Sequence, residues 1–220
     1  MDALRKPPRR PGRTGPQFSR ADPAIRRRLL VEAAIRCLAR GGIAAFTVDN
    51  IRKEAKVSRG LLNHYFSSKD DLLIEIYRTS LYDSMMTLIG RSGGSRRAGD
   101  PDDRLRAIVE ANFAPAYFSR ANVLVWLALW GEIAVNARLR TTHRRLYDSY
   151  RKALAEAIAA VARKRRRAVD ASRLSLSFIS LVDGLWLEWC LNPEAISAAE
   201  ARRAGYDLLE SRLGTLAKVS

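Results

Sequence analysis

The sequence predicts an all-α fold of about nine helices, and three observations lead to that prediction. Apolar residues recur at spacings of three and four along nearly every long segment. Ser, Thr, Asp or Pro precedes these segments, and Gly or Pro follows several of them, as expected for helix ends. No segment shows the apolar–polar alternation of a β-strand. The chain of 220 residues is 47% hydrophobic, which is enough for one large domain or two smaller ones.

The first helix is expected to begin at Asp22-Pro23, an N-cap followed by Pro at the first helical position. Residues 1–22 before it are rich in Pro, Gly and Arg, so we expect a disordered basic arm that adds non-specific affinity for DNA. Gly41-Gly42 should end this helix. Its apolar stripe consists of Ile25, Leu29, Leu30, Ala33, Ala34, Cys37 and Leu38.

Two short helices follow, one capped by Thr47 and one capped by Ser58, with a tight turn at Lys56-Val57 between them. This arrangement predicts a helix-turn-helix, in which the helix after the turn lies in the major groove of DNA. That helix should end near Tyr65-Phe66. The expected core of the motif is Ile51, Ala55, Val57, Leu61, Leu62 and Phe66.

The outer face of the third helix carries Arg59, Asn63 and His64, whose side chains can hydrogen-bond to base edges. Gly60 removes side-chain bulk where another molecule must come close. Free N–H groups at helix starts attract phosphate, and Lys69 is placed to clamp it. The candidate DNA-binding residues are Thr47, Ser58, Arg59, Gly60, Leu61, Asn63, His64, Tyr65 and Lys69.

Six further helices complete the prediction. Their expected spans are 68–89, 101–117, 121–136, 138–166, 170–191 and 197–213, with a loop at residues 90–101 as the seam between two parts. The last helix opens with a Ser197–Glu200 capping box. We therefore divide the chain into the arm 1–22, a helix-turn-helix DNA-binding domain 23–68 and a helical ligand-binding and dimerisation domain 69–220.

The net charge of +16 favours a polyanionic partner, with nucleic acid first and an anionic membrane surface second. Charge interrupts the longest apolar runs, so we expect no signal peptide, no membrane span and a cytoplasmic location. Cys37 and Cys190 are expected to be buried, reduced thiols. Two Cys and two His far apart make no metal site of known spacing, and no cofactor is expected. The basic run 163–167 suits a helix C-terminus better than a nucleic-acid contact.

Residues 47–73 resemble the DNA-binding signature of TetR-family repressors, with Thr, Ile, Ala-x-Val-Ser, Gly, an aromatic-Phe pair and Ser-Lys before Leu-Leu. Two positions differ: Lys56 stands where the family usually has Gly, and Asn63 where it often has Tyr. A Lys at positive φ would cost ~1 kcal/mol. The resemblance implies a homodimer on palindromic double-stranded DNA, joined through the last two helices. Interface candidates are Leu176, Ile179, Leu208, Leu209 and Leu213, although some of them must serve the protomer's own core.

The second half resembles the choline-responsive repressors of glycine-betaine synthesis, the BetI branch of that family. The resemblance rests on Asn63-His64-Tyr65-Phe66, the Trp126–Trp130 pair and the run Asp183 to Trp186. It implies a small cationic effector such as choline.

Helical spacing places Trp126 with Trp130 and Trp186 with Trp189, which suits either the core or an aromatic cage for a quaternary ammonium. Asp183 and Glu132 are nearby acids. The candidate ligand-binding residues are Trp126, Trp130, Asp183, Trp186, Trp189, Tyr117, Asn112 and Tyr147.

An enzyme is not expected, because the chain has no Gly-rich phosphate loop, nucleophile elbow or recognisable pair of catalytic carboxylates. Two alternatives stay open at this stage. One is an architectural DNA-binding protein that responds to no ligand, and the other is a TetR-type regulator with a different effector, such as one controlling efflux or catabolic genes.

Overall fold

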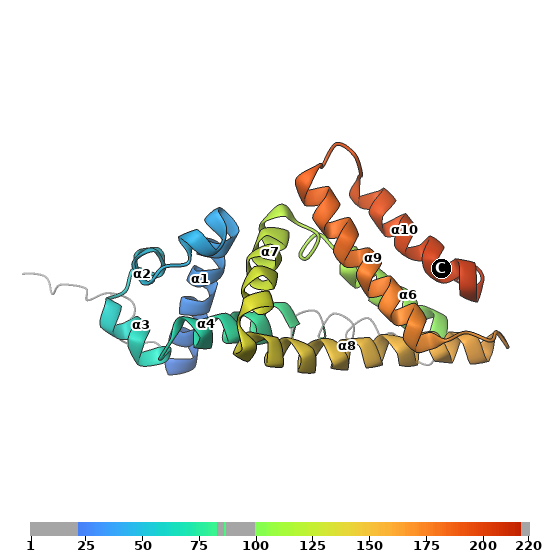
Figure 1. Cartoon of the computed structure of the whole chain (residues 1–220), viewed down its shortest axis with the longest axis horizontal. Helices are drawn as coiled ribbons and strands as arrows, with labels where there is room; N and C mark the ends of the chain where they lie inside the picture. The colour runs from blue at the N-terminus through green and yellow to red at the C-terminus, as the bar shows by residue number, and fades with distance from the viewer. Residues whose placement is uncertain (1–21, 83–85, 87–99, 217–220) are drawn as a thin grey trace, which may run out of the picture.

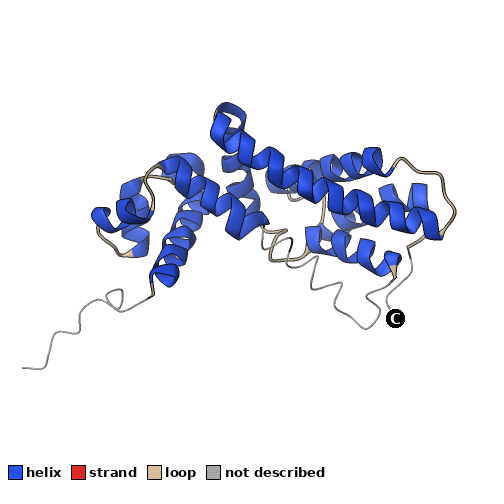
Figure 2. Cartoon of the chain, turned by 90° about the horizontal axis from the view of Figure 1, so that it is seen from below, coloured by secondary structure: helices blue, strands red, loops and turns tan. Residues whose placement is uncertain are grey.

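The computed structural model describes residues 22–82, 86 and 100–216. In this part of the chain it contains nine helical segments, counting α4 with η2, and no strand, which confirms the all-α prediction (Figure 2). The arm at 1–21, most of the predicted seam at 90–101 and the far end of the fourth predicted helix lie outside the described residues.

The first helix, α1 (Pro23–Ala45), is capped by Asp22, whose carboxylate accepts the backbone N–H of Ala24 at 2.8 Å. Helical geometry is lost at Gly41 and Gly42, as predicted, and Gly42 has a φ of 58°. Leu30, Ala33, Ala34, Cys37 and Leu38 are buried as expected. Ile25 is 43% exposed instead, because the first turn extends beyond the core.

The helix-turn-helix consists of α2 (Val48–Ala55) and α3 (Arg59–Tyr65), which pack beside α1 at one end of the molecule (Figure 1). Lys56 lies between them in the left-handed region, with φ 56° and ψ 43°. This confirms the positive φ considered from the sequence, with its cost of ~1 kcal/mol for a residue that has a Cβ.

The fourth helix begins as α4 (Lys69–Glu75) and continues as a π-helix, η2 (Ile76–Tyr82). The sequence predicted a regular α-helix here, since apolar spacing does not distinguish i→i+5 from i→i+4 hydrogen bonding. Leu72, Leu73, Ile76 and Tyr77 are buried. Short π-helical segments occur frequently at functional sites.

Five helices form the second half: α6 (Pro101–Phe113), α7 (Arg120–Val135), α8 (Ala137–Lys164), α9 (Ala171–Leu191) and α10 (Ala198–Leu213). The long α8 runs away from the helix-turn-helix, and α9 and α10 lie side by side at the opposite end of the molecule from α3 (Figure 1). Packing of α1 against α7 joins the two halves into one continuous hydrophobic core.

The helix predicted to reach Tyr117 ends at Phe113. The reason is Pro115, whose ring disfavours helical geometry in the residue before it. Ala114 accordingly has φ −64° and ψ 141°. Tyr117 therefore lies in the connection between α6 and α7 rather than on a helix.

The two cysteines, Cys37 and Cys190, are free and buried, as predicted. By length and composition α9 is apolar enough to cross a membrane, but a buried core helix meets the same criterion, so the absence of a membrane span stays a prediction. The high apolar content arises because α9 has two apolar faces. Phe178, Val182 and Trp186 pack in the core, whereas Leu176, Leu187 and Leu191 are exposed.

Candidate functional site

The recognition helix α3 presents Arg59, Gly60, Asn63 and His64 to solvent, on the face predicted to meet DNA. Leu61 was predicted both for the core and for the DNA-facing set, and it is only half-buried. The core prediction for Leu61 is wrong, because Leu62 and Phe66, one turn apart, fill the inward positions. A Cβ on Gly60 would meet no atom of the protomer within 4 Å, so only an approaching molecule would need the space.

Arg59 is positioned by Asp49 of α2, whose carboxylate accepts its guanidinium N–H groups at 3.1 and 3.2 Å. Hydrogen bonds from Arg52 and then from Arg59 hold the pKa of Asp49 below its ordinary value. The sequence reasoning missed Asp49, because its pairing depends on how the two helices cross.

Thr47 and Lys69, which are predicted to contact phosphate, line one groove between α2, α3 and the start of α4, together with Asn63 from the predicted base-contacting set. The Thr47 hydroxyl oxygen caps α2 by accepting the N–H of Asn50 at 3.2 Å. Nζ of Lys69 lies 4.0 Å from Oε1 of Glu132. Glu132 is therefore paired toward the DNA-facing side, and it is not one of the residues lining the ligand pocket described below.

The first turn of α4 is tied to the corner between α7 and α8. The Asn136 side chain donates to Asp70 at 2.8 Å, and Arg138 forms an ion pair with Asp71. Since α4 directly follows the recognition helix, this contact fixes the recognition helix relative to the second half.

A pocket lies between α6, α7, α8 and α9, with about 320 Å³ of empty space that includes some open solvent. The part of this space that is enclosed by the protein is only about large enough for one water molecule. The pocket is lined by Asn112, Trp126, Trp130, Tyr147, Tyr150, Ile179, Val182, Asp183 and Trp186. The structure thus brings together six of the eight residues predicted for a ligand site.

The two remaining predicted residues lie elsewhere. The ring of Trp189 packs on Phe118 with centroids 4.5 Å apart, nearly one turn beyond Trp186 along α9 and outside the pocket. Tyr117 does not line the pocket, since α6 ends before it. Tyr150, Ile179 and Val182 were missed. Tyr150 lies one turn after Tyr147 on α8 and could have been found from that spacing.

Three indole rings form the aromatic wall. The centroids of Trp126 and Trp130 are 5.6 Å apart, and those of Trp126 and Trp186 are 6.4 Å apart and inclined by 62°. Nε1 of Trp186 donates to the backbone carbonyl of Asn112 at 3.1 Å. This bond satisfies the polar atom of the ring and fixes its orientation.

Asp183 supplies the pocket's carboxylate. Its two oxygens accept the Tyr147 hydroxyl at 3.1 and 3.2 Å. Burial raises the pKa of Asp183 to about 6, and the hydrogen bond from Tyr147 opposes that rise. At neutral pH Asp183 is therefore mostly ionised, and the pocket offers a negative charge beside aromatic rings.

A polar chain links the pocket to the helix that follows the recognition helix. The Tyr77 hydroxyl lies 2.9 Å from Nδ1 of His143, and the His143 ring stacks on Tyr147 at 4.4 Å. Tyr77 also packs edge-on against Trp126 at 5.5 Å. Burial lowers the pKa of His143. Movement of Trp126 or Tyr147 in the pocket wall would therefore disturb the contacts that Tyr77 of η2 makes with Trp126 and His143.

The residues predicted for the dimer interface separate into two groups. Leu209 and Leu213 are fully buried in the protomer, and Ile179 is buried beside the pocket, so these three are the candidates that serve the protomer's own core. Leu208 is half-buried, and Leu176 is 50% exposed. The sequence could not separate the two faces of α9, because both are apolar.

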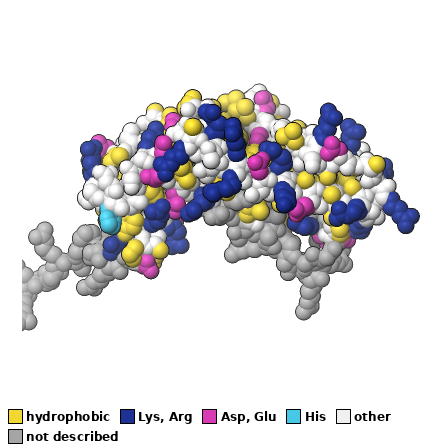
Figure 3. All heavy atoms as spheres, turned by 60° about the horizontal axis from the view of Figure 1, so that its bottom comes forward, with side chains coloured by type: hydrophobic (Ala, Val, Ile, Leu, Met, Phe, Trp, Pro, Cys, Tyr) yellow, Lys and Arg dark blue, Asp and Glu magenta, His cyan; other side chains and the backbone are white. Residues whose placement is uncertain are grey.

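Positive charge is spread along the molecule and is not confined to the helix-turn-helix (Figure 3). In the predicted basic run, Lys164 pairs with Asp100 and Asp102, and Arg165 pairs with Asp102 and donates to the carbonyls of Leu213 and Gly214. These contacts support the helix-end interpretation for these two residues.

Comparison with known proteins supports both resemblances. Residues 30–76 match the family model of tetR-family bacterial regulatory proteins, and residues 101–214 match that of the BetI-type transcriptional repressor C-terminal domain. The chain is 32% identical over 200 residues to HTH-type transcriptional regulator BetI 1 of Chromohalobacter salexigens, covering 86% of this chain and 91% of the relative.

Solved structures show the same similarity. A transcriptional regulator from Pseudomonas aeruginosa PAO1 superposes with a TM-score of 0.77 at 32% identity, covering 89% of this chain and 93% of that one. A regulator from Saccharomonospora viridis in complex with choline superposes with a TM-score of 0.72 at 25% identity, covering 85% and 96%. These relatives are transcriptional regulators, which agrees with the prediction that the chain is not an enzyme. The chain belongs to the TetR family of DNA-binding transcriptional repressors and, within that family, to the BetI type.

Proposed function

We propose that the protein acts in the cytoplasm as a homodimeric repressor of a palindromic operator. One short recognition helix reads few base pairs, so useful specificity requires two helices related by a two-fold axis. Arg59, Leu61, Asn63 and His64 would lie nearest the base edges. Thr47 and Lys69, which line one groove, would hold the phosphate backbone on the side of α4.

We further propose that the effector is a quaternary ammonium of the choline class. The observation that carries this proposal is the half-buried carboxylate of Asp183 in a pocket walled by Trp126, Trp130 and Trp186. A quaternary ammonium donates no conventional hydrogen bond, so its recognition needs ring faces and a negative charge. Each ring face contributes roughly 0.5–2 kcal/mol when the cation is desolvated. The choline complex of the Saccharomonospora viridis regulator supports the same class of ligand.

Ligand entry would require the side chains to move, because the pocket encloses little free space. A ligand shifts an equilibrium only when it binds one state better than the other, and a pocket that must open provides that difference. Trp126 and Tyr147 line the pocket, and Tyr77 contacts the first while His143 contacts the second. Opening would therefore displace η2 and, through α4, the recognition helix.

Tryptophan fluorescence tests the effector proposal in solution. Titration with choline is compared with 3,3-dimethylbutan-1-ol, a neutral compound of nearly the same shape. We expect a saturable fluorescence change with choline and a much weaker one with the alcohol, because only choline is attracted by Asp183. Equal responses would contradict recognition of the charge. No response to millimolar choline would exclude choline as effector and leave the repressor function intact.

A further inference from the structure

We propose that the hydroxyl group of Tyr150 donates a hydrogen bond to an oxygen atom of the effector, so that the pocket selects quaternary ammonium compounds that carry an accepting oxygen close to the cation. The inference rests on the proposed effector class. It adds a second point of recognition to the pocket and names the residue that provides it.

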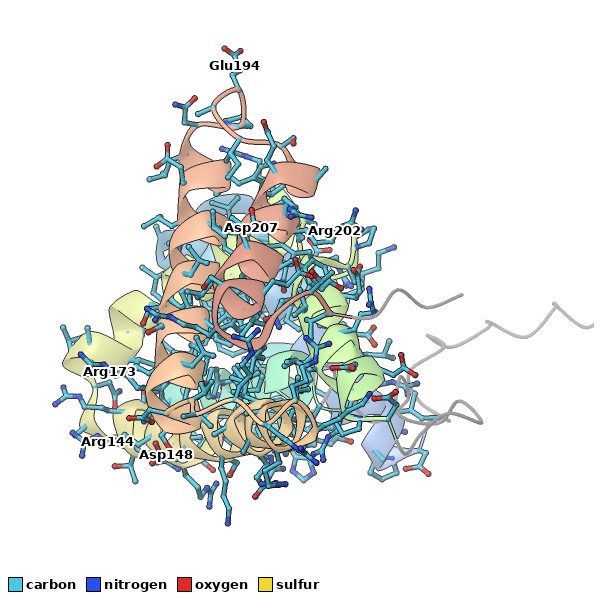
Figure 4. All side chains as sticks on the ribbon, turned by 90° about the vertical axis from the view of Figure 1, so that its right-hand side faces the viewer. Arg144, Asp148, Arg173, Glu194, Arg202 and Asp207 are labelled. Carbon is cyan, nitrogen blue, oxygen red and sulfur yellow. The ribbon has the colours of Figure 1, made fainter. Side chains whose placement is uncertain are left out.

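Tyr150 lies on the inner face of α8, one turn after Tyr147. It lines the pocket and is only 4% exposed. Arg144 and Asp148 of the same helix are exposed, and Figure 4 shows them at the outer edge of the molecule. The hydroxyl proton of Tyr150 therefore cannot be donated to bulk solvent, and it needs an acceptor inside the pocket.

The side chain of Asn112 determines how the Tyr150 hydroxyl is paired. Nδ2 of Asn112 donates to the backbone carbonyl of Ile108 at 2.8 Å, and because a carbonyl can only accept, this contact fixes the orientation of the amide. The same Nδ2 lies 3.0 Å from the Tyr150 hydroxyl oxygen. An amide nitrogen can only donate, so the Tyr150 oxygen is the acceptor there, and its own proton must point elsewhere.

The proton of Tyr150 is poorly paired among the described residues. Its hydrogen-bond acceptor is Oδ1 of Asn112 at 3.4 Å, whereas an O–H···O hydrogen bond usually spans about 2.5–3.0 Å. The Asp183 carboxylate accepts the Tyr147 hydroxyl instead. Burial raises the pKa of Tyr150, so the hydroxyl keeps its proton at neutral pH. A buried donor in this state gains free energy when a better acceptor arrives.

The pocket thus has a cation-binding side and a donor side. Trp126 and Trp130 of α7 and the carboxylate of Asp183 attract a cation. The Tyr147 hydroxyl is bonded to that carboxylate, and the ring centroids of Tyr147 and Tyr150 are 6.3 Å apart. One small molecule can therefore reach both sides. Choline, in which two carbon atoms separate the nitrogen from the oxygen, has this form.

The donor side is tied to the aromatic wall through Asn112. Its backbone carbonyl accepts Nε1 of Trp186 at 3.1 Å, while its side chain donates to the Tyr150 oxygen. We expect Tyr150 and Trp186 to keep their relative positions when other side chains of the pocket move to admit a ligand. A donor that is already in place lowers the cost of ordering the site on binding.

Two ligands that differ only at the oxygen test the proposal. Choline is compared with N,N,N-trimethylpropan-1-aminium, in which a methyl group replaces the hydroxyl, by calorimetric titration of the full-length protein. We expect wild type to bind choline more tightly. In Tyr150→Phe the ratio of choline affinity to the affinity for the propyl compound should fall about tenfold, because the variant cannot donate to the oxygen.

Tyr147→Phe is the matched control, one turn away on the same helix. It removes the hydroxyl that is bonded to Asp183, which acts on the cation and not on the oxygen. We expect this variant to change the affinity for both compounds by the same factor and to leave their ratio at the wild-type value. A ratio that falls in Tyr147→Phe but not in Tyr150→Phe would assign the oxygen to Tyr147 and overturn the proposal.

The outcomes separate recognition of the oxygen from the effector class. If Tyr150→Phe changes the affinity for both compounds equally, Tyr150 does not contact the ligand's oxygen and the proposal is wrong. Wild type that binds the propyl compound more tightly than choline would overturn it without any variant, because a buried hydroxyl group that lacks a partner costs free energy. The cation site would remain in both cases. If wild type binds neither compound, the proposed effector class is wrong and the inference is overturned with it.

Discussion

The DNA-facing surface and the ligand pocket are built in opposite ways. The former is formed by exposed polar side chains on short helices close in sequence, with Arg59 held by a single acid, Asp49. The latter gathers aromatic side chains from three helices, α7, α8 and α9, and fixes them with internal hydrogen bonds such as that of Tyr147 with Asp183. The DNA-facing surface is exposed before any partner binds, whereas the side chains of the ligand pocket must move apart before a ligand can enter. Substitutions should therefore separate cleanly: changes on α3 alter operator recognition, and changes in the pocket alter the response to ligand.

The largest effect is expected from Asp183→Asn. It removes the negative charge but keeps the shape of the side chain and a partner for the Tyr147 hydroxyl. Choline affinity should fall by about 2–4 kcal/mol, or roughly 30- to 1,000-fold, because a half-buried cation loses its counter-charge. Calorimetric titration measures the change. Operator affinity without ligand should remain at the wild-type level, and a parallel loss of operator affinity would show that the two sites are not separable.

Asn63→Ala tests the exposed face. If Asn63 makes a bidentate contact to a base, operator preference should weaken by ~1–3 kcal/mol at one base pair in each half-site. Binding to a panel of single-base operator variants reveals which position is relaxed. Lys69→Ala is the matched comparison and should weaken all sequences alike, with a salt slope smaller by roughly one. A uniform loss of affinity in Asn63→Ala together with an altered base preference in Lys69→Ala would contradict this assignment.

The pH dependence of ligand binding should follow the raised pKa of Asp183. Below about pH 6 the carboxyl takes up a proton and becomes neutral, so the attraction for a cation is lost as pH falls. Choline affinity should fall roughly tenfold from pH 7 to pH 5. Protonation of His143 would act in the same direction, although burial lowers its pKa. Asp183→Asn should show a much flatter profile; an equally steep one would assign the titration to another group.

The raised pKa of Asp183 makes its contribution to the stability of the fold depend on pH in the opposite direction to ligand affinity. Because the folded-state pKa of Asp183 is raised, the folded protein binds that proton more tightly than the unfolded chain. The contribution of this group to stability is therefore present at low pH and is lost as pH rises toward about 6.

The smallest effect is expected at the turn between α2 and α3. Lys56→Gly should raise the free energy of unfolding by up to ~1 kcal/mol, because glycine adopts the left-handed region without strain. Thermal unfolding should shift upward by about 2–4 °C. Operator affinity should be unchanged. A lower melting temperature would mean that the Lys56 side chain makes a stabilising contact that outweighs the strain.

The same contrast explains what the sequence could predict. Helix starts at Asp22, Thr47, Ser58, Ser68 and Ser197 were all located correctly, because a cap depends on residues within three positions. The outward face of α3 was found for the same reason. These features depend on local spacing, which a single sequence contains.

The pocket depends on packing between distant segments, and its prediction was partly wrong. Trp126 and Trp130, one turn apart, do line it together, but Trp189 faces Phe118 and Glu132 faces Lys69. Nothing in the spacing of α9 shows which of its two apolar faces is buried. Its buried face includes Ile179, which was a candidate for the interface, and its outer face includes Leu176, Leu187 and Leu191.

The most direct test of the central claim measures operator release by the effector. Fluorescence anisotropy follows full-length protein on a labelled palindromic operator while choline is added at fixed salt and pH 7.5. We expect wild type to leave the operator over the concentration range in which tryptophan fluorescence changes, and Asp183→Asn to stay bound over that range. Wild-type protein that binds choline by fluorescence yet keeps its operator affinity unchanged would contradict the account, because the pocket would then not be coupled to the recognition helix.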